Sequence, residues 1–126
     1  MVSIKGKQYK SIRFSVLRDQ LVSRKKKQTF RCLFFPSFVE GDTVAIMFGK
    51  EFLYFATITD MYCKRICEIN LEEAIADGFN SVNEFQKGLM KINHIKSNRR
   101  WGIIIKYEEI KIENNVLSNL DSFIDQ

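Results

Sequence analysis

The side chains best equipped for chemistry lie in one short stretch, KKKQTFR, at residues 25–31. Three ammonium groups precede the Thr29 hydroxyl and the Arg31 guanidinium, which alternate and so would lie on one side of a strand. Lysine supplies a mobile point charge and arginine a rigid fork of donors. This combination suits an anion or a planar, hydrogen-bonding ligand such as a nucleotide. A solvated basic turn is the simpler alternative.

A helix and a strand are expected to meet at this stretch. Leu17 and Leu21 lie four residues apart within residues 16–23, which predicts a helix. Its last turn is predicted over the basic residues 24–27, since cations suit the negative end of the helix dipole. The apolar run over residues 29–35 predicts a strand, and Pro36 ends it because proline cannot donate to a sheet ladder. The reactive groups are therefore expected at a helix-to-strand corner.

The remaining elements follow from periodicity and capping signals. Alternation and runs of aromatic or β-branched residues predict strands. These cover residues 11–15, 43–48, 52–60 with an extension to 69, and 101–107. Asn70 caps a helix at 71–76, and Ser81 with Glu84 forms a capping box before a second helix. The order β-α-β-β-β-α-α-β predicts an α+β domain with an antiparallel, barrel-like sheet and flanking helices.

Length and charge narrow the class of protein. The 126 residues, 45% of them hydrophobic, fit one domain. Residues 1–31 carry ten Lys or Arg side chains against Asp19 alone, whereas residues 108–126 carry five carboxylates against one lysine. We expect the chain to consist of a basic N-terminal arm (residues 1–11), a folded domain (12–112) and an acidic C-terminal tail (113–126). A basic N-terminal quarter indicates a polyanionic partner.

Several classes of protein and site are disfavoured by composition. The three cysteines, Cys32, Cys63 and Cys67, with the single His94, show no ligand spacing, and a zinc site needs about four ligands. We expect free, mostly buried thiols and neither metal nor cofactor. No apolar run approaches the roughly 18 residues of a membrane span, and the N-terminus has no apolar signal region. A cytoplasmic protein with no membrane partner is the default expectation.

Four features in sequence order resemble the ASCH domain, a branch of the PUA-like superfamily. They are the motif Arg24-x-Lys26-x-x-Thr29-x-Arg31, the turn Gly41-Asp42 before a strand, the block Phe55-Ala56-Thr57-Ile58-Thr59-Asp60, and Asp77-Gly78-Phe79 followed by Ser81 and Phe85. The apolar strand from Trp101 to Tyr107 completes the resemblance, which spans about residues 12–108. It implies a small β-barrel with helices and a cleft that holds RNA or a modified nucleoside.

The resemblance also implies an enzymatic alternative. Some small bacterial ASCH proteins hydrolyse N4-acetylcytidine with a Lys, a Thr three residues later and a downstream Glu. The first two correspond to Lys26 and Thr29, whereas the acid position falls on Asp77, whose side chain is shorter by one methylene. Proton transfer depends on a reach of roughly 2.6–3.2 Å, so this departure bears directly on the activity.

Three functions stay open, and the first is favoured. They are binding of RNA, single-stranded nucleic acid or a modified nucleoside in a basic cleft, hydrolysis of N4-acetylcytidine, and a protein-interaction or regulatory role. The candidate catalytic residues are Lys26, Thr29 and Asp77. The candidate ligand-binding residues are Arg24, Lys25, Lys26, Lys27, Thr29, Arg31, Lys96, Arg99, Arg100 and Trp101, the last because an indole can stack a base.

Overall fold

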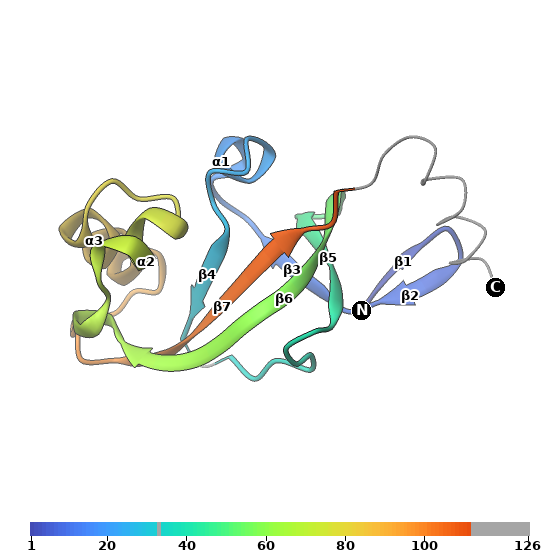
Figure 1. Ribbon diagram of the computed structural model, residues 1–126. Helices are drawn as coiled ribbons and strands as arrows, with labels where there is room; N and C mark the ends of the chain where they lie inside the picture. Colours follow the sequence, from blue (N-terminus) through green and yellow to red (C-terminus); the bar gives the residue numbers. More distant parts are fainter. Residues whose placement is uncertain (33, 112–126) are drawn as a thin grey trace.

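The computed structural model describes residues 1–32 and 34–111 (Figure 1). The predicted acidic tail therefore lies outside the described residues. The elements run β1 (Val2–Ile4), β2 (Lys7–Tyr9), β3 (Ser11–Phe14), α1 (Arg18–Val22), β4 (Gln28–Arg31), β5 (Thr43–Phe48), β6 (Glu51–Arg65), a 3-10 turn (Ile66–Glu68), α2 (Leu71–Ala76), α3 (Val82–Ile92) and β7 (Trp101–Glu109). The predicted α+β class is confirmed.

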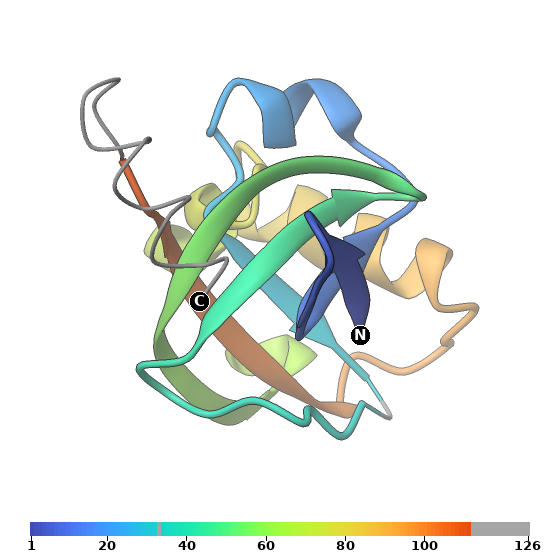
Figure 2. The ribbon, with the colours of Figure 1, turned by 90° about the vertical axis from the view of Figure 1, so that its right-hand side faces the viewer.

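A five-stranded sheet with the order β3-β5-β6-β7-β4 forms the body of the domain. Figure 2 shows that it curls into a half-barrel, as the predicted barrel-like sheet requires. The predicted antiparallel arrangement is wrong for one pair, because β3 and β5 run parallel. A parallel pair needs a long crossover connection, and α1 with β4 supplies it here.

Strand β6 is the central strand of the sheet. It is one strand of 15 residues where two shorter segments were predicted, and it pairs with both β5 and β7. The ladder with β7 shifts register between Ile58 and Asp60, which leaves Thr59 as an inserted residue. Such a bulge bends a strand and increases its twist, which helps a long strand to follow a curled sheet.

Helix α1 is shorter than predicted, whereas α2 is not. Helix α1 ends at Val22, and Leu17 (φ 62°) and Arg24 (φ 66°), both in the left-handed region, bracket it. Residues 25–27 are consequently not helical, contrary to prediction. Helix α2 has the predicted bounds and its Asn70 cap. None of the helices in the described part of the chain is long and apolar enough to cross a bilayer.

Two apolar clusters hold the domain together. One fills the curl of the sheet and includes Ile12, Ile46 and Ile58, all essentially inaccessible to solvent. The other packs α2 and α3 against β4 and β7, where Phe30 and Phe85 meet edge-on with ring centroids 5.9 Å apart. The second cluster fixes the helices relative to β4, and so fixes the corner that carries the candidate residues.

The N-terminal residues 1–11, expected as an arm, fold into the β1–β2 hairpin and the start of β3. Lys5 (φ 52°) and Gly6 (φ 80°) form its two-residue turn, and positive φ at both positions is typical of tight hairpins. Val2 packs against β5, and the Lys10 ammonium lies 3.2 Å from the Asp42 carboxylate. The basic residues are thus carried by ordered structure.

Candidate functional site

The backbone of residues 25–27 is held on both sides. Lys26 N donates to Gln20 O (3.1 Å), and Lys27 N donates to Ala76 O at the end of α2 (2.7 Å). On the other side, Tyr107 N donates to Lys27 O (3.2 Å) and the Tyr107 hydroxyl donates to Lys26 O (3.1 Å). The corner is therefore anchored to α1, α2 and β7 although it has no regular secondary structure.

The Lys26 side chain enters the interior and meets Asp77. Its ammonium forms an ion pair with Asp77 Oδ1 and also donates to Asp77 O (3.1 Å). Gln28 Nε2 donates to Asp77 Oδ2 (3.1 Å) and to the backbone oxygen of Glu73 (3.1 Å). The Lys26 and Asp77 side chains are 7% and 3% exposed, so this charged pair is almost completely removed from water.

A pocket of about 180 Å³ adjoins this pair. Its polar lining includes Lys26, Thr29, Arg31 and Asp77, which the structure brings together from the corner, β4 and the end of α2, and further polar residues are Arg13, Ser15 and Asn93. Its apolar wall includes the Phe14 ring of β3 and residues of the α2–α3 connection and α3. We call this cavity the Thr29 pocket.

Arg31 organises the polar side of the Thr29 pocket. Its Nε donates to Thr29 Oγ1 (3.0 Å), and its Nη2 donates to Arg13 O (2.8 Å), which links the two edge strands β4 and β3. The guanidinium carbon lies 5.0 Å from the centroid of the Phe14 ring. Burial lowers the pKa of Arg31, while Asp77 and Tyr107 oppose the shift. The group still carries its charge at neutral pH, because its ordinary pKa is above about 12.

Burial has the opposite effect on the acid of the pocket. It raises the pKa of the Asp77 carboxyl above its ordinary value, because ionisation in a water-poor environment is unfavourable. The charge of Lys26, the bonds from Lys26 and Gln28, and the charge of Arg31 act against this rise. Asp77 is therefore an acid that can hold its proton more readily than an exposed aspartate.

Helix α2 is fixed in place by Glu73, one turn before Asp77. The Glu73 carboxylate accepts bonds from the Tyr62 hydroxyl, from Lys64 Nζ (2.8 Å) and from Asn70 N (2.9 Å). Glu73 is only 3% exposed, so this network ties the helix to β6 from inside the protein. Because Asp77 directly follows this helix, the network also helps to place Asp77.

Comparison with known proteins establishes the fold. No protein-family model and no curated protein matches the sequence. The structure of an ASCH domain from Lactobacillus crispatus JV V101 matches with a TM-score of 0.61 at 9% identity, over 72% of this chain and 68% of that chain. The chain has the fold of an ASCH domain. The predicted ASCH-type barrel is thus confirmed as a fold.

A second structural match supports the ASCH-type fold. It is a protein from Enterococcus faecalis V583, assigned to the family DUF984, with a TM-score of 0.55 and 16% identity over 76% of this chain and 71% of that chain. At identities this low, the two matches show that the chain shares their fold, and they say nothing about its activity. The function must be argued from the residues of the site.

Not every candidate residue faces the Thr29 pocket. The Arg24 guanidinium pairs with the Glu109 carboxylate and stacks 3.9 Å from the centroid of the Tyr54 ring. Lys25 is exposed, and its ammonium lies 3.4 Å from Asn80 Oδ1. Arg24 is consequently committed to internal contacts, whereas the Lys25 charge remains at the surface.

The second predicted basic cluster lies in the loop before β7 and at the start of that strand. Arg100 O accepts a hydrogen bond from Ile66 N (3.1 Å), which places the loop before β7 against the end of β6. Trp101, at the start of β7, is 54% exposed, and the Arg65 guanidinium lies 4.9 Å from its ring centroid. In the β4–β7 ladder, Tyr107 lies beside the corner at the far end of β7. The start of β7 lies beside the end of β4 at Arg31, away from the corner, and none of the four residues Lys96, Arg99, Arg100 and Trp101 lines the Thr29 pocket.

Two pocket residues were read from the sequence only as structural. Phe14 was predicted within a strand and Phe79 within a motif, yet both line the Thr29 pocket. The alternation of Ile12 and Phe14 predicts that both point inward, and both are buried. That Phe14 also faces a cavity depends on how β4 and α3 pack beside β3, which the alternation within β3 does not predict.

The cysteines and acidic residues offer no metal centre in the described part of the chain, since no cluster of three or more ligand side chains occurs there. All three cysteines are free, as predicted. The prediction that they are mostly buried is wrong: Cys63 and Cys67 are exposed, and Cys32 is half-buried. Cys63 lies near the end of the long strand β6.

Proposed function

We propose that this chain is an ASCH-type domain that binds RNA or a nucleotide and holds one base in the Thr29 pocket. The observation that carries the proposal is the convergence of a hydroxyl, a carboxyl, an ammonium and a guanidinium beside an aromatic wall. A base edge needs both donors and acceptors, and a base face is stabilised by an aromatic ring or a guanidinium plane.

The size of the pocket supports a single base. Its volume of about 180 Å³ is below the roughly 300–1,000 Å³ of sites for drug-sized ligands. Phe14 and Arg31 already stack on one another, so a planar ring can extend that stack. Asp77 can donate a hydrogen bond when it is protonated, and it accepts hydrogen bonds when it is ionised. It can therefore pair with an acceptor or with a donor on the edge of a pyrimidine base.

Basic residues outside the pocket would contact the phosphates of a longer strand. Lys25 is exposed at the corner, and Arg99 and Arg100 lie at the other end of β7 with the exposed Trp101. Neutralising phosphates releases counterions, so the affinity for RNA should fall steeply with salt. Binding that is independent of salt would favour the protein-interaction alternative.

The test is a titration of a labelled single-stranded oligoribonucleotide at several salt concentrations with wild type, Thr29→Val and Thr43→Val. Thr29→Val removes the hydroxyl from the pocket at almost constant volume. Thr43, exposed on β5, provides the matched control. We expect salt-dependent binding that weakens about tenfold in Thr29→Val alone, the effect of one lost hydrogen bond to a buried group. Equal affinities for both variants would contradict a base at Thr29.

A second function, hydrolysis of an N-acylated cytidine, is favoured by one observation. Lys26, Thr29 and Asp77, the three residues that correspond to the catalytic set of some ASCH proteins, line the same small pocket. Thr29 Oγ1 also accepts a hydrogen bond from the charged Arg31. A donor at this oxygen stabilises negative charge that develops on it, which favours loss of the hydroxyl proton.

A balanced reaction can be written with these groups. Transfer of a proton from Lys26 to Asp77 within the pair leaves a neutral amine and a carboxylic acid. The amine takes the proton of Thr29 as Oγ1 bonds to the acyl carbon, and the acid protonates the departing N4 nitrogen. Water then cleaves the acyl-threonine ester, which releases the carboxylic acid and restores the hydroxyl.

Incubation of the purified protein with N4-acetylcytidine tests this second function through the release of cytidine. Lys26→Ala and Thr29→Ala should each abolish turnover, because residues that act as a unit do not contribute additively. Asp77→Glu should preserve or raise the rate if the shorter acid is functional. Binding of the nucleoside without product, even at high protein concentration, would show that the site only binds.

A further inference from the structure

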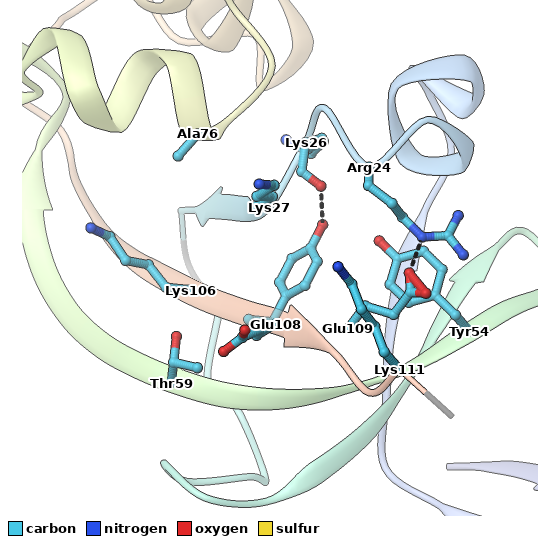
Figure 3. A pocket seen from close by; sticks show the side chains of 11 residues that line it. Arg24, Lys26, Lys27, Tyr54, Thr59, Ala76, Lys106, Glu108, Glu109 and Lys111 are labelled. Atoms are coloured by element: carbon cyan, nitrogen blue, oxygen red, sulfur yellow. Dashed lines mark hydrogen bonds and ion pairs between the residues drawn. The ribbon is translucent and has the colours of Figure 1, made fainter. Parts of the chain in front are cut away.

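A second and larger pocket lies on the other side of the corner. It has a volume of about 480 Å³ and is placed over β6 and β7, below the end of α2 at Ala76 (Figure 3). Lys26 belongs to both cavities: its ammonium meets Asp77 beside the Thr29 pocket, while its backbone oxygen meets the Tyr107 hydroxyl in the second one. We call this second cavity the Lys106 pocket.

The Lys106 pocket is rich in cations. Lys27, Lys106 and Lys111 line it together with Arg24. Arg24 is neutralised by Glu109, as Figure 3 shows. Within the described part of the chain, none of the three lysines forms an ion pair with a carboxylate. Three ammonium groups without an ion-pair partner among the described residues therefore line one cavity, together with the exposed Glu108.

A bulge in the sheet contributes a further polar group. Thr59 is the residue inserted where the β6–β7 ladder shifts register, directly beside the Lys106 position, and it is exposed in the Lys106 pocket. Bulges are common next to functional sites because they redirect a side chain and free backbone groups from the ladder. Glu108, also exposed there, supplies an acceptor.

We propose that the Lys106 pocket binds the phosphate of a nucleotide. Lys27, Lys106 and Lys111 contact the phosphate oxygens, since charge-assisted hydrogen bonds from ammonium groups to phosphate are short and roughly twice as strong as neutral ones. The Thr59 hydroxyl and the Glu108 carboxylate serve the sugar hydroxyls. A free nucleotide and a single-stranded nucleic acid present the same phosphate group, and the experiment below distinguishes these two sources.

The proposal does not depend on what the Thr29 pocket binds. Cytidine, which has no phosphate, addresses the Thr29 pocket alone, whereas inorganic phosphate addresses the Lys106 pocket alone. Failure of one site can therefore be distinguished from failure of the other. In a nucleic acid both sites would act on one strand, with Lys26 as the wall between them.

The test is an NMR titration of the full, isotopically labelled chain with inorganic phosphate, cytidine 5′-monophosphate, cytidine and a short oligoribonucleotide. We expect phosphate and the monophosphate to shift the amide signals of Lys27, Thr59 and Lys106, and cytidine to leave them unchanged. A higher affinity for the oligonucleotide than for the monophosphate identifies nucleic acid as the source of the phosphate. Equal affinities identify the free nucleotide.

Paired charge variants complete the experiment. Lys27→Gln with Lys106→Gln should weaken phosphate binding at least tenfold, whereas Lys87→Gln with Lys91→Gln, exposed residues of α3, should not change it. Equal weakening in both double variants would show attraction by net charge alone and would overturn the proposal. So would the absence of shifts at Lys27, Thr59 and Lys106 with all three phosphate compounds.

Discussion

Lys26 and Asp77, 51 residues apart in the chain, form an ion pair that is buried between the corner and the end of α2. The same ammonium also bonds to the backbone oxygen of Asp77, so the contact fixes both the carboxyl group and the turn that carries it. The pair joins the two parts of the chain whose polar groups meet in the Thr29 pocket. The pair therefore contributes both to the stability of the fold and to the arrangement of the polar groups in the Thr29 pocket.

Breaking this pair should be costly. Asp77→Ala leaves a buried amine without its partner, and we expect a loss of about 3–5 kcal/mol in the free energy of unfolding. Glu51→Ala, which breaks the exposed pair between Arg18 and Glu51, is the matched control and should change stability little. Urea unfolding of both variants measures the difference. Equal losses would show that the Lys26–Asp77 pair is no more important to folding than a surface contact.

The pH dependence of stability gives a test of Asp77 itself. Because burial raises its pKa, the folded protein keeps a proton that the unfolded chain releases above about pH 4. The stability due to this group is thus greatest at low pH and is lost as pH rises through the raised pKa. The free energy of unfolding of wild type relative to Asp77→Asn should fall over that window. A rise instead would mean that Lys26 and Arg31 lower the pKa.

Glu73 should show the opposite sign. Burial tends to raise its pKa, but the bonds from Asn70, Lys64 and Tyr62 outweigh burial and lower it. The carboxylate therefore stabilises the folded protein above its ordinary pKa of about 4.3, and this stability is lost as pH falls through the lowered value. Glu73→Gln should be destabilised at pH 7 and approach wild type in acid. A destabilisation that does not vary with pH would indicate packing alone.

Gly78 should be required for the geometry of Asp77. It has a φ of 96°, where side chains are strained, and a Cβ there would collide with the Gln20 side chain. Gly78→Ala should lower the free energy of unfolding by about 1–3 kcal/mol and should weaken cytidine binding. Gly41, with a φ of 91° and open space around it, is the control. Gly41→Ala should be destabilised without a change in binding, and weaker binding in both would refute the specific role.

Local signals predicted much of the fold. The bounds of β5 and α2 agree with the sequence, because turn residues and the Asn70 cap mark them without reference to the rest of the chain. The β1–β2 hairpin was not predicted, although Lys5-Gly6 between alternating residues is a hairpin signal; the charges of that segment favoured an arm. The parallel pairing of β3 and β5 depends on the path of the whole chain, and no local pattern contains it.

The candidate site was also predictable only where local strand geometry determines it. Thr29 and Arg31 alternate on β4, so their joint position follows from strand geometry, and they do line one pocket. The contact of Lys26 with Asp77 depends on how α2 packs on the corner. The division of the basic residues between two pockets and the distant loop depends on the β4–β7 register, which the sequence does not specify.

The most direct measurement of the central claim is a crystal structure of the protein soaked with cytidine. The account predicts density for the base in the Thr29 pocket, beside Phe14 and within hydrogen-bonding distance of Thr29, Arg31 or Asp77. A soak of Thr29→Val under the same conditions should show weaker density. Cytidine bound at another surface, or an empty Thr29 pocket at a saturating concentration, would contradict the account.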